Sequence, residues 1–289
     1  MQHSGLFIGL TTIDIQYFVD SFPGSNKKIK TQPPEILVGG PATNAAVAFA
    51  HLNGGAFLAS AIGDNSFTRF INNDFELTNV HHFNLDKNPD TNAVLATVIT
   101  SVENGDRNIF THQPQPLKSI DLQFERLFAE VKPEIVMLDG FHPEIAIDVA
   151  KTARKQSIPV VLDCGSWKPQ FEQLLNFCNI VICSEDFYPP GCNRAQDTMD
   201  YLHNKKIKQY AVTRGERGIL FVDESYKGEI EIKKVPVADT LGAGDFLHGA
   251  FCFCFLKLNH FKHALIAASD IATETCRYPG TRKWLNFTK

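Results

Sequence analysis

The sequence lacks any long uninterrupted apolar run. Its longest, around residues 251–256, falls far short of the roughly 20 apolar residues that a helix needs to cross a bilayer. The first residues also lack a basic segment followed by an apolar stretch, which is the pattern of a secretory signal. We therefore expect a cytoplasmic protein without a membrane partner.

Dense positive charge is absent as well. The chain carries 28 Lys and Arg against 32 Asp and Glu, for a net charge of -4, and it has no run rich in Lys or Arg. A protein that binds the backbone of DNA or RNA normally gathers basic residues in a patch or a run. We expect no nucleic-acid partner.

The cysteines show no pairing pattern. There are seven, an odd number, and none forms a Cys-x-x-Cys pair or falls at the spacing of zinc ligands. Because cysteine is among the most buried residue types, the sequence predicts free, mostly buried thiols. A structural metal site is not predicted.

The chain does contain an alternation of short β-rich apolar runs with longer helical patterns. Strands this apolar on both faces belong in a sheet that helices cover on both sides. A chain of 289 residues, 44% of them apolar, can bury one large core. We predict a single α/β domain over residues 1–289, with a doubly wound, mainly parallel sheet flanked by helices. The strands are predicted at 6–10, 56–62, 135–138, 159–162, 180–183 and 210–213, and helices at 42–52 and 142–156.

Two stretches break this rhythm. Apolar and polar residues alternate, as they do in antiparallel strands, in two pairs of segments: 15–19 with 28–36, and 93–99 with 107–110. The Glu-Asn-Gly-Asp run at 103–106 favours a hairpin turn. Four such strands without crossover helices would form a small separate sheet, at about 15–37 and 91–112. Such a sheet could be a lid over a cleft or an edge that mediates dimer contacts, and the pattern fits both.

The run Asp239-Thr-Leu-Gly-Ala-Gly-Asp245 carries the strongest chemical signal. Gly242 and Gly244 allow a tight turn and a close approach of ligand to backbone. The helix that follows, predicted to end near residue 258, begins with unpaired amides and partial positive charge, which together favour an anion. Phosphoryl transfer needs such an anion site beside a carboxylate that accepts the attacking hydroxyl's proton. Asp245 is therefore a predicted catalytic base, and the alternative is a helix cap.

Two further segments have the character of a ligand site. Gly39 and Gly40 lead into a predicted helix, and Asn44 lies one turn inside it, where its amide could donate to and accept from a polyol. The alternative is a simple turn that Asn44 caps. Asp14 follows the first strand, at the edge where open α/β sheets bind ligands, although a solvated loop aspartate would look the same.

These motifs, in this order and spacing, resemble the ribokinase-like (PfkB) family of carbohydrate kinases over nearly the whole chain. The resemblance implies ATP and Mg²⁺ as cofactors and a small-molecule sugar as substrate. It also implies an α/β body with a small β-sheet lid that often mediates dimerisation, so a homodimer through the lid is expected.

The resemblance further assigns roles to the transfer machinery. Asp245 would be the catalytic base, and the amides of Gly242, Ala243 and Gly244 would form the anion hole. The nucleotide phosphates would lie against Thr213 and Gly215, and also against Gly242 and Gly244.

Other residues would contact the sugar. Its hydroxyls would be held by Asp14, Gly39, Gly40 and Asn44. Arg107 of the lid would add a contact, although a solvated hairpin charge is an equal interpretation. Asp139, after the strand at 135–138, lies where the ribokinase pattern has a substrate-contacting carboxylate.

The chain departs from the family pattern at one metal-associated motif. Many members have Asn-x-x-Glu where this chain has Ser184-Glu-Asp-Phe187, so Glu185 and Asp186 would have to handle Mg²⁺ through water. The segment 267–282 resembles the part that borders the adenine and, in some members, forms a K⁺ site together with Asp239 and Leu241. Asp163, after the strand at 159–162, is one more candidate at the sheet edge.

The sequence therefore predicts an ATP-dependent kinase that phosphorylates a hydroxyl of a monosaccharide or related polyol. One alternative is an adenosine-type nucleoside kinase, which would need an apolar or aromatic wall beside Asp14. Another is a sugar-phosphate kinase, for which Arg107, Lys27 and Lys28 could bind the phosphate. A catalytically silent sugar or nucleotide sensor is the non-enzyme alternative, and the intact Asp245 and glycines speak against it.

Overall fold

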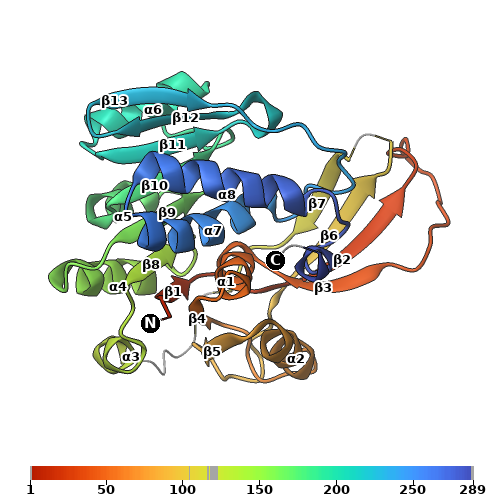
Figure 1. Cartoon of the computed structure of the whole chain (residues 1–289). Coiled ribbons are helices and arrows are strands. Elements are labelled where there is room, and N and C mark those ends of the chain that lie inside the picture. Colours follow the sequence, from red (N-terminus) through yellow and green to blue (C-terminus); the bar gives the residue numbers. More distant parts are fainter. Residues whose placement is uncertain (1, 104, 116, 118–122, 288–289) are drawn as a thin grey trace.

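Two β-sheets of unequal size form the framework of the molecule (Figure 1). The computed structural model describes residues 2–103, 105–115, 117 and 123–287. The larger sheet has nine strands in the order β13-β12-β11-β10-β9-β8-β1-β4-β5, and the smaller has four in the order β3-β2-β6-β7. The predicted class, a mainly parallel α/β sheet with a small second sheet, is confirmed.

The nine-stranded sheet is parallel from β5 to β11 and ends in two antiparallel strands. The strand predicted at 135–138 is found at those residues, and the other five predicted strands are found with ends shifted by up to two residues. The nine are β1 (Ser4–Ile8), β4 (Gly55–Ser60), β5 (Val80–Asn84), β8 (Ile135–Leu138), β9 (Val160–Cys164), β10 (Ile180–Ser184), β11 (Gln209–Thr213), β12 (Ile219–Asp223) and β13 (Tyr226–Ile230).

Helices cover both faces of this sheet because its strands are apolar on both faces. In β1, for example, Phe7 packs into one core cluster, whereas Leu6 and Ile8 pack into the other. The first cluster lies under α1 (Pro41–His51), α2 (Thr68–Thr78), α7 (Ala243–Leu258) and α8 (Phe261–Thr275). The second lies under α3 (Phe124–Val131), α4 (Pro143–Lys155), α5 (Phe171–Leu174) and α6 (Ala195–Asn204).

The four-stranded sheet, which we call the lid, comprises β2 (Thr12–Val19), β3 (Glu35–Gly39), β6 (Val94–Ser101) and β7 (Arg107–Thr111). The strand predicted at 28–36 was wrong in position, because β3 begins only at Glu35. Pro33 and Pro34 precede it and have no N–H to give to a ladder. In the predicted hairpin turn, Asn104 lies outside the described residues.

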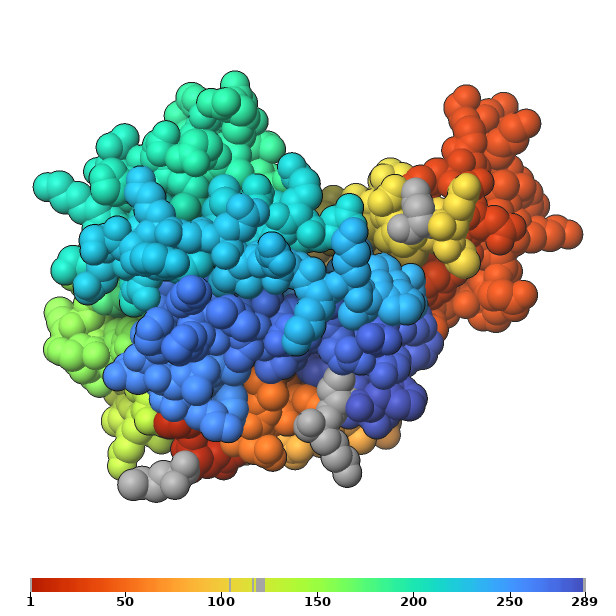
Figure 2. All heavy atoms as spheres, turned by 45° about the horizontal axis from the view of Figure 1, so that its top comes forward, coloured from red at the N-terminus to blue at the C-terminus, as the bar shows by residue number. Residues whose placement is uncertain are grey.

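The central pair of the lid, β2 and β6, is parallel, although alternation had suggested antiparallel strands. Between them the chain crosses the body through α1, β4, α2 and β5, and it returns to the lid in the same direction. Figure 2 shows the lid projecting to one side of the body as a separate lobe.

The structure can be compared with two features that the sequence lacks, a long apolar run and a pairing pattern of cysteines. Among the described residues, no helix combines the length and apolarity required to cross a bilayer. All seven cysteines are free thiols, and five of them are buried, as predicted.

Close packing of α1 on α7 brings the two predicted motifs together. A Cβ on Gly249 would lie 2.0 Å from the carbonyl oxygen of Ala45, so only glycine allows the two helices to approach this closely. Asn44 precedes that contact on α1, and Asp245 lies one turn before it on α7. The contact therefore fixes the distance between the two side chains.

Candidate active site

Helix α7 begins at the glycine-rich turn. Gly242 is its N-cap, with φ 76° in the left-handed region that favours glycine, and no side chain caps the helix. Asp245 lies in the first turn. The alternative interpretation of Asp245 as a helix cap is therefore wrong, and its carboxylate is available for other contacts.

The Asp245 carboxylate is half-buried and makes one hydrogen bond from the neighbouring helix. Asn44 Nδ2 donates to its Oδ2 at 2.9 Å. Burial, and secondarily the nearby negative charge of Asp163, raise the pKa of Asp245 to about 7, against the opposing effects of Asn44, His248 and Arg107. A carboxyl group with this pKa can take up a proton near neutral pH.

The paired glycines before α1 are required for different reasons. A Cβ on Gly39 would lie 2.1 Å from Asp14 Oδ2, so this glycine makes room for the aspartate. Gly40 is the N-cap of α1 with φ 101°, and a Cβ there would lie 2.3 Å from the carbonyl oxygen of Leu10. The Asn44 side chain does not cap α1.

Asp14 lies on β2 of the lid and is only 6% exposed. Burial raises the pKa of its carboxyl, an effect that a hydrogen bond from Thr12 and the charge of Arg282 partly offset. Thr12 Oγ1 donates to Asp14 Oδ1 at 2.7 Å. The interpretation of Asp14 as a solvated loop residue is therefore wrong.

Contacts between the lid and the glycine-rich run hold the two parts together. Arg107 Nη1 donates to the hydroxyl of Thr240. Gln16 Nε2 donates to Asp239 Oδ2 at 2.7 Å, and the same carboxylate accepts from the amides of Leu241 and Gly280. The pairing of β2, β6 and β7 puts Asp14, Gln16 and Arg107 on one face of the lid.

The amides predicted to form the anion hole are not equivalent. The N–H of Ala243 closes a turn onto Thr240 O at 3.2 Å. Gly244 lies in the first turn of α7, where N–H groups have no helical acceptor, and a Cβ on it would meet no atom within 4 Å outside its own turn. Space for a ligand therefore adjoins Gly244.

Asp139 is buried beneath the start of α1. Its carboxylate accepts from the amides of Leu10 (2.8 Å), Ala42 (3.2 Å) and Phe141 (2.9 Å). Desolvation raises the pKa of this carboxyl to about 6. These bonds make Asp139 a support for β1 and α1, and its contact with substrate stays a prediction.

The predicted nucleotide residues lie at the carboxyl ends of β10 and β11. Thr213 Oγ1 donates to Cys183 O at 3.3 Å, and Gly215 has φ 57° with open space around it. Glu185 follows β10, and its carboxylate is paired with Arg217. Asp186 is exposed next to it.

Three side chains with direct access to this network were not singled out by the sequence. Arg282 donates to Asn44, and Asp74 of α2 pairs with Arg282. His248, one turn after Asp245, lies between Gly244 O (2.7 Å), Ile182 O (3.2 Å) and Asp163 Oδ1 (3.5 Å). Position in the Gly-Ala-Gly-Asp helix could have indicated His248, whereas no local motif marks Arg282 or Asp74.

A helix start that favours an anion, a carboxylate in its first turn and a β-sheet lid are the arrangement expected of a phosphotransferase with an alcohol acceptor. The model of the pfkB family carbohydrate kinases matches residues 2–286 of the chain. The protein therefore belongs to the pfkB family of carbohydrate kinases, which use ATP.

Relatives within this family are distant. A ribokinase from Lactococcus lactis is 25% identical over 257 residues, covering 85% of this chain and 81% of that protein. A nucleoside kinase from Methanocaldococcus jannaschii is 24% identical over 267 residues, covering 86% and 82%. The structure of Arabidopsis thaliana ribokinase complexed with ribose and ATP has a TM-score of 0.73 and 20% identity, with full coverage of both chains. At this identity, the structure supports the fold alone.

Proposed function

We propose that the protein phosphorylates a hydroxyl of a monosaccharide or related polyol with ATP, and that Asp245 is the general base. The observation that carries this proposal is the position of Asp245: a carboxyl with a pKa near 7, in the first turn of a helix whose start favours anions. The similarity to a ribokinase supports a sugar as acceptor.

In this proposal each part of the site has a separate task. Asp14 accepts a hydrogen bond from a sugar hydroxyl, which orients the attacking oxygen toward Asp245. Asp245 takes the proton of that oxygen as the new bond to the γ-phosphorus of ATP forms, while the bond from this phosphorus to its bridging oxygen breaks and ADP leaves with the electron pair. The amides at the start of α7, including that of Gly244, donate to the oxygens of the transferring phosphoryl group, and Arg107 adds positive charge from the lid.

Metal ions would assist at two places. Mg²⁺ usually keeps several waters and uses one or two carboxylates with the phosphates, a donor set that Glu185 and Asp186 fit through water. Within the described residues no three His, Cys, Asp or Glu side chains converge as metal ligands. For K⁺, a fitting oxygen is Gln16 Oε1, which is buried and has no hydrogen-bond partner within the described part of the chain, while Gln16 Nε2 donates to Asp239. Bound Mg²⁺ would neutralise phosphate charge during transfer.

A coupled assay of ADP release tests the proposed function. The panel contains ribose, other monosaccharides and polyols, nucleosides and sugar phosphates. We expect turnover that depends on one of the sugars or polyols. Absence of turnover on every acceptor would refute a kinase and favour the sensor, and a preference for sugar phosphates would assign Arg107, Lys27 and Lys28 a phosphate-binding role.

A nucleoside kinase is the second candidate function. The cross-strand neighbours of Asp14 are Leu37 and Ala96, which provide an apolar surface on the same side of the lid. The similarity to a nucleoside kinase supports the same candidate. Turnover on adenosine that exceeds turnover on every sugar would favour it.

The pH dependence of the reaction should follow the ionisation of the Asp245 carboxyl. Only the ionised carboxylate accepts a proton, so activity is lost as Asp245 becomes protonated below its pKa of about 7. We expect kcat/KM to fall about tenfold for each pH unit below that value and to level off above it. Measurement between pH 5 and 9 checks this, and a profile that stays flat down to pH 5 would contradict the assignment.

The face of the lid that points away from Asp14 would join two copies of the chain. Ile36 (52% exposed), Leu95 (38%) and Phe110 (64%) lie on that face. We expect a dimer in sedimentation velocity and a monomer after Phe110→Glu, because the charge would be buried unpaired. Leu77→Glu, at a still more exposed leucine on α2 (77%), is the control and should leave the dimer intact.

A further inference from the structure

A largely buried ion pair contacts the Asn44 side chain from the side opposite to Asp245. Arg282 and Asp74 pair through two parallel bonds, Nε to Oδ1 at 3.0 Å and Nη2 to Oδ2 at 2.9 Å. Their side chains are only 15% and 16% exposed. The remaining nitrogen, Nη1, donates to Asn44 Oδ1 at 2.9 Å and to Thr281 O at 3.0 Å. All three guanidinium nitrogens are therefore engaged.

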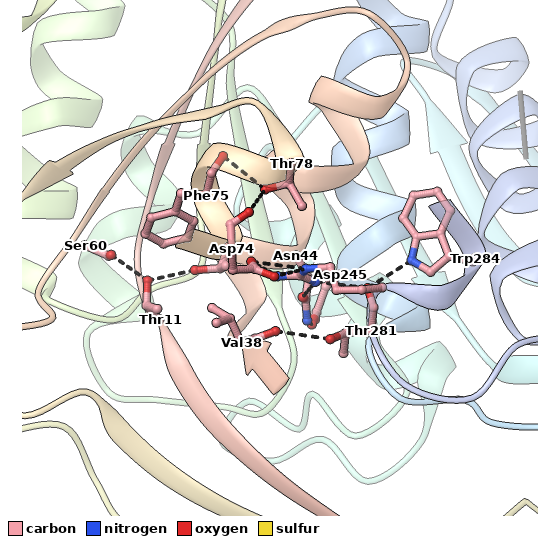
Figure 3. A network of polar contacts seen from close by, with 12 residues as sticks. Thr11, Val38, Asn44, Ser60, Asp74, Phe75, Thr78, Asp245, Thr281 and Trp284 are labelled. Atoms are coloured by element: carbon pink, nitrogen blue, oxygen red, sulfur yellow. Dashed lines mark hydrogen bonds and ion pairs between the residues drawn. The ribbon is translucent and has the colours of Figure 1, made fainter. Parts of the chain in front are cut away.

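The backbone around Arg282 is anchored independently. The Thr281 hydroxyl donates to Val38 O at 3.1 Å, and Trp284 Nε1 donates to Thr281 O at 3.1 Å. Trp284 is fully buried and packs against Phe246 of α7. Figure 3 shows Asp74, Asn44 and Asp245 within this one polar network. Arg282 is thus held in place from both its backbone and its side chain.

This arrangement decides how the Asn44 amide is turned. Arg282 presents only N–H groups, so Asn44 must direct its oxygen toward Arg282 and its NH₂ toward Asp245. With the amide reversed, donors would face donors at Arg282. Without Arg282 the amide could reverse whenever Asp245 carries a proton, and Asn44 Oδ1 would then accept that proton in a hydrogen bond.

We propose that Arg282, locked by Asp74, is a positioning residue that holds Asn44 as a donor to Asp245 and so keeps Asp245 in its proton-accepting form. Arg282 acts through Asn44 rather than by contact with the reacting atoms. The inference rests on the proposed function, since it concerns the same base.

The other groups that face Asp245 do not provide this control. Asp163 of β9 disfavours its charge, whereas His248 of α7 and Arg107 of β7 favour it through space. None of them fixes the direction of a hydrogen bond to its carboxylate. Asn44 alone donates to Asp245 in the described structure, and Arg282 determines that orientation.

The hydrogen bond from Arg282 also limits which donors and acceptors of Asn44 remain for a substrate. Its oxygen faces Arg282 and one amide hydrogen faces Asp245, so a single N–H remains. The sequence had suggested that Asn44 both donates to and accepts from a polyol. In this orientation it would donate to a hydroxyl oxygen, and acceptance of the hydroxyl proton falls to the carboxylates.

The test replaces the whole ion pair, because removing one partner would leave a buried charge unpaired. In the double variant Asp74→Leu/Arg282→Met the acid limb of kcat/KM should move up by roughly one pH unit, which corresponds to about a tenfold loss near pH 6.5 that disappears by pH 9. The matched control is Asp197→Leu/Arg194→Met, which removes an Arg–Asp ion pair at the start of α6 that has no assigned role in the site, and it should leave the limb in place.

Each outcome decides the inference. A limb that does not move, or a loss of activity that is equal at all pH values, would overturn it, because a merely structural role changes the amount of active enzyme and not its pH profile. If the double variant fails to fold, Arg282→Lys should move the acid limb of kcat/KM in the same direction, since lysine cannot bind Asp74 through two bonds and Asn44 at once. If Asp245→Asn leaves turnover unchanged, the proposed function fails instead, which keeps the two failures distinguishable.

Discussion

Asp245→Asn is expected to lower kcat by roughly 10²- to 10⁴-fold, the usual contribution of a general base. Asparagine has nearly the shape of aspartate, and its side-chain oxygen can still accept the bond that Asn44 donates to Asp245. What it cannot do is take up the proton of the attacking hydroxyl. The KM for the sugar should therefore change little, and the loss should appear in kcat.

The folding of this variant supplies its control. The pKa of Asp245 is raised from 3.8 to about 7 in the folded protein, so the folded state holds a proton between these pH values more tightly than the unfolded chain does. Stability from this group is present at low pH and is lost as pH rises through about 7. At pH 8 the Asp245→Asn variant, which is neutral at this position, should melt no lower than the parent protein. Asp148→Asn, at an exposed carboxylate on α4, should keep full activity. An Asp245→Asn enzyme with normal kcat would exclude Asp245 as the base.

Features written within a few consecutive residues could be predicted from the sequence. The strand at Ile135–Leu138 was predicted residue for residue because it is a short β-rich run that is apolar on both faces. The glycine turn and the helix start at Asp245 were predicted because the glycines, the helix and Asp245 form one uninterrupted run. In both cases the chemistry that fixes the structure is local.

Strand direction and strand start in the lid could not be predicted from alternation. Residues on parallel and antiparallel strands alternate alike, so only the path of the chain makes the β2–β6 pair parallel. The alternating segment 28–36 contains Pro33 and Pro34, which have no backbone N–H to donate. The strand therefore begins only after them, although the alternation of apolar and polar residues starts earlier. These outcomes follow from connectivity and turn chemistry rather than from side-chain polarity.

The Asp74–Arg282 pair shows why part of the site was missed. The two residues are 208 positions apart. Asp74 belongs to no run with a recognisable chemical pattern, and the resemblance of segment 267–282, which ends at Arg282, concerned adenine and K⁺ rather than an ion pair. They meet because α2 and the segment after α8 both pack against α1. A charged residue on a helix is usually solvated, so its burial can be known only once the fold is known.

The second large effect is expected from Gly39→Ala, which should lower kcat/KM for the sugar by roughly 10- to 100-fold. A methyl group on Gly39 would lie 2.1 Å from Asp14 Oδ2 and 2.8 Å from the hydroxyl of Thr12. Asp14 would have to leave its position, and a hydrogen bond between a hydroxyl and a charged group contributes about 1.5–3 kcal/mol. Steady-state kinetics with the best sugar of the panel measures the loss, most of it in KM.

Gly24→Ala is the matched control, because a Cβ there meets no atom within 4 Å and the variant differs by the same methyl group. Asp14→Asn should reproduce the direction of the Gly39→Ala effect without any steric change, which separates loss of the carboxylate from displacement of β3. Because Gly39 lacks the left-handed conformation of Gly40, its replacement strains no backbone angle. A Gly39→Ala enzyme with an unchanged KM would show that Asp14 does not hold the sugar, and the hydroxyl would then have to be oriented by Asn44 and the lid.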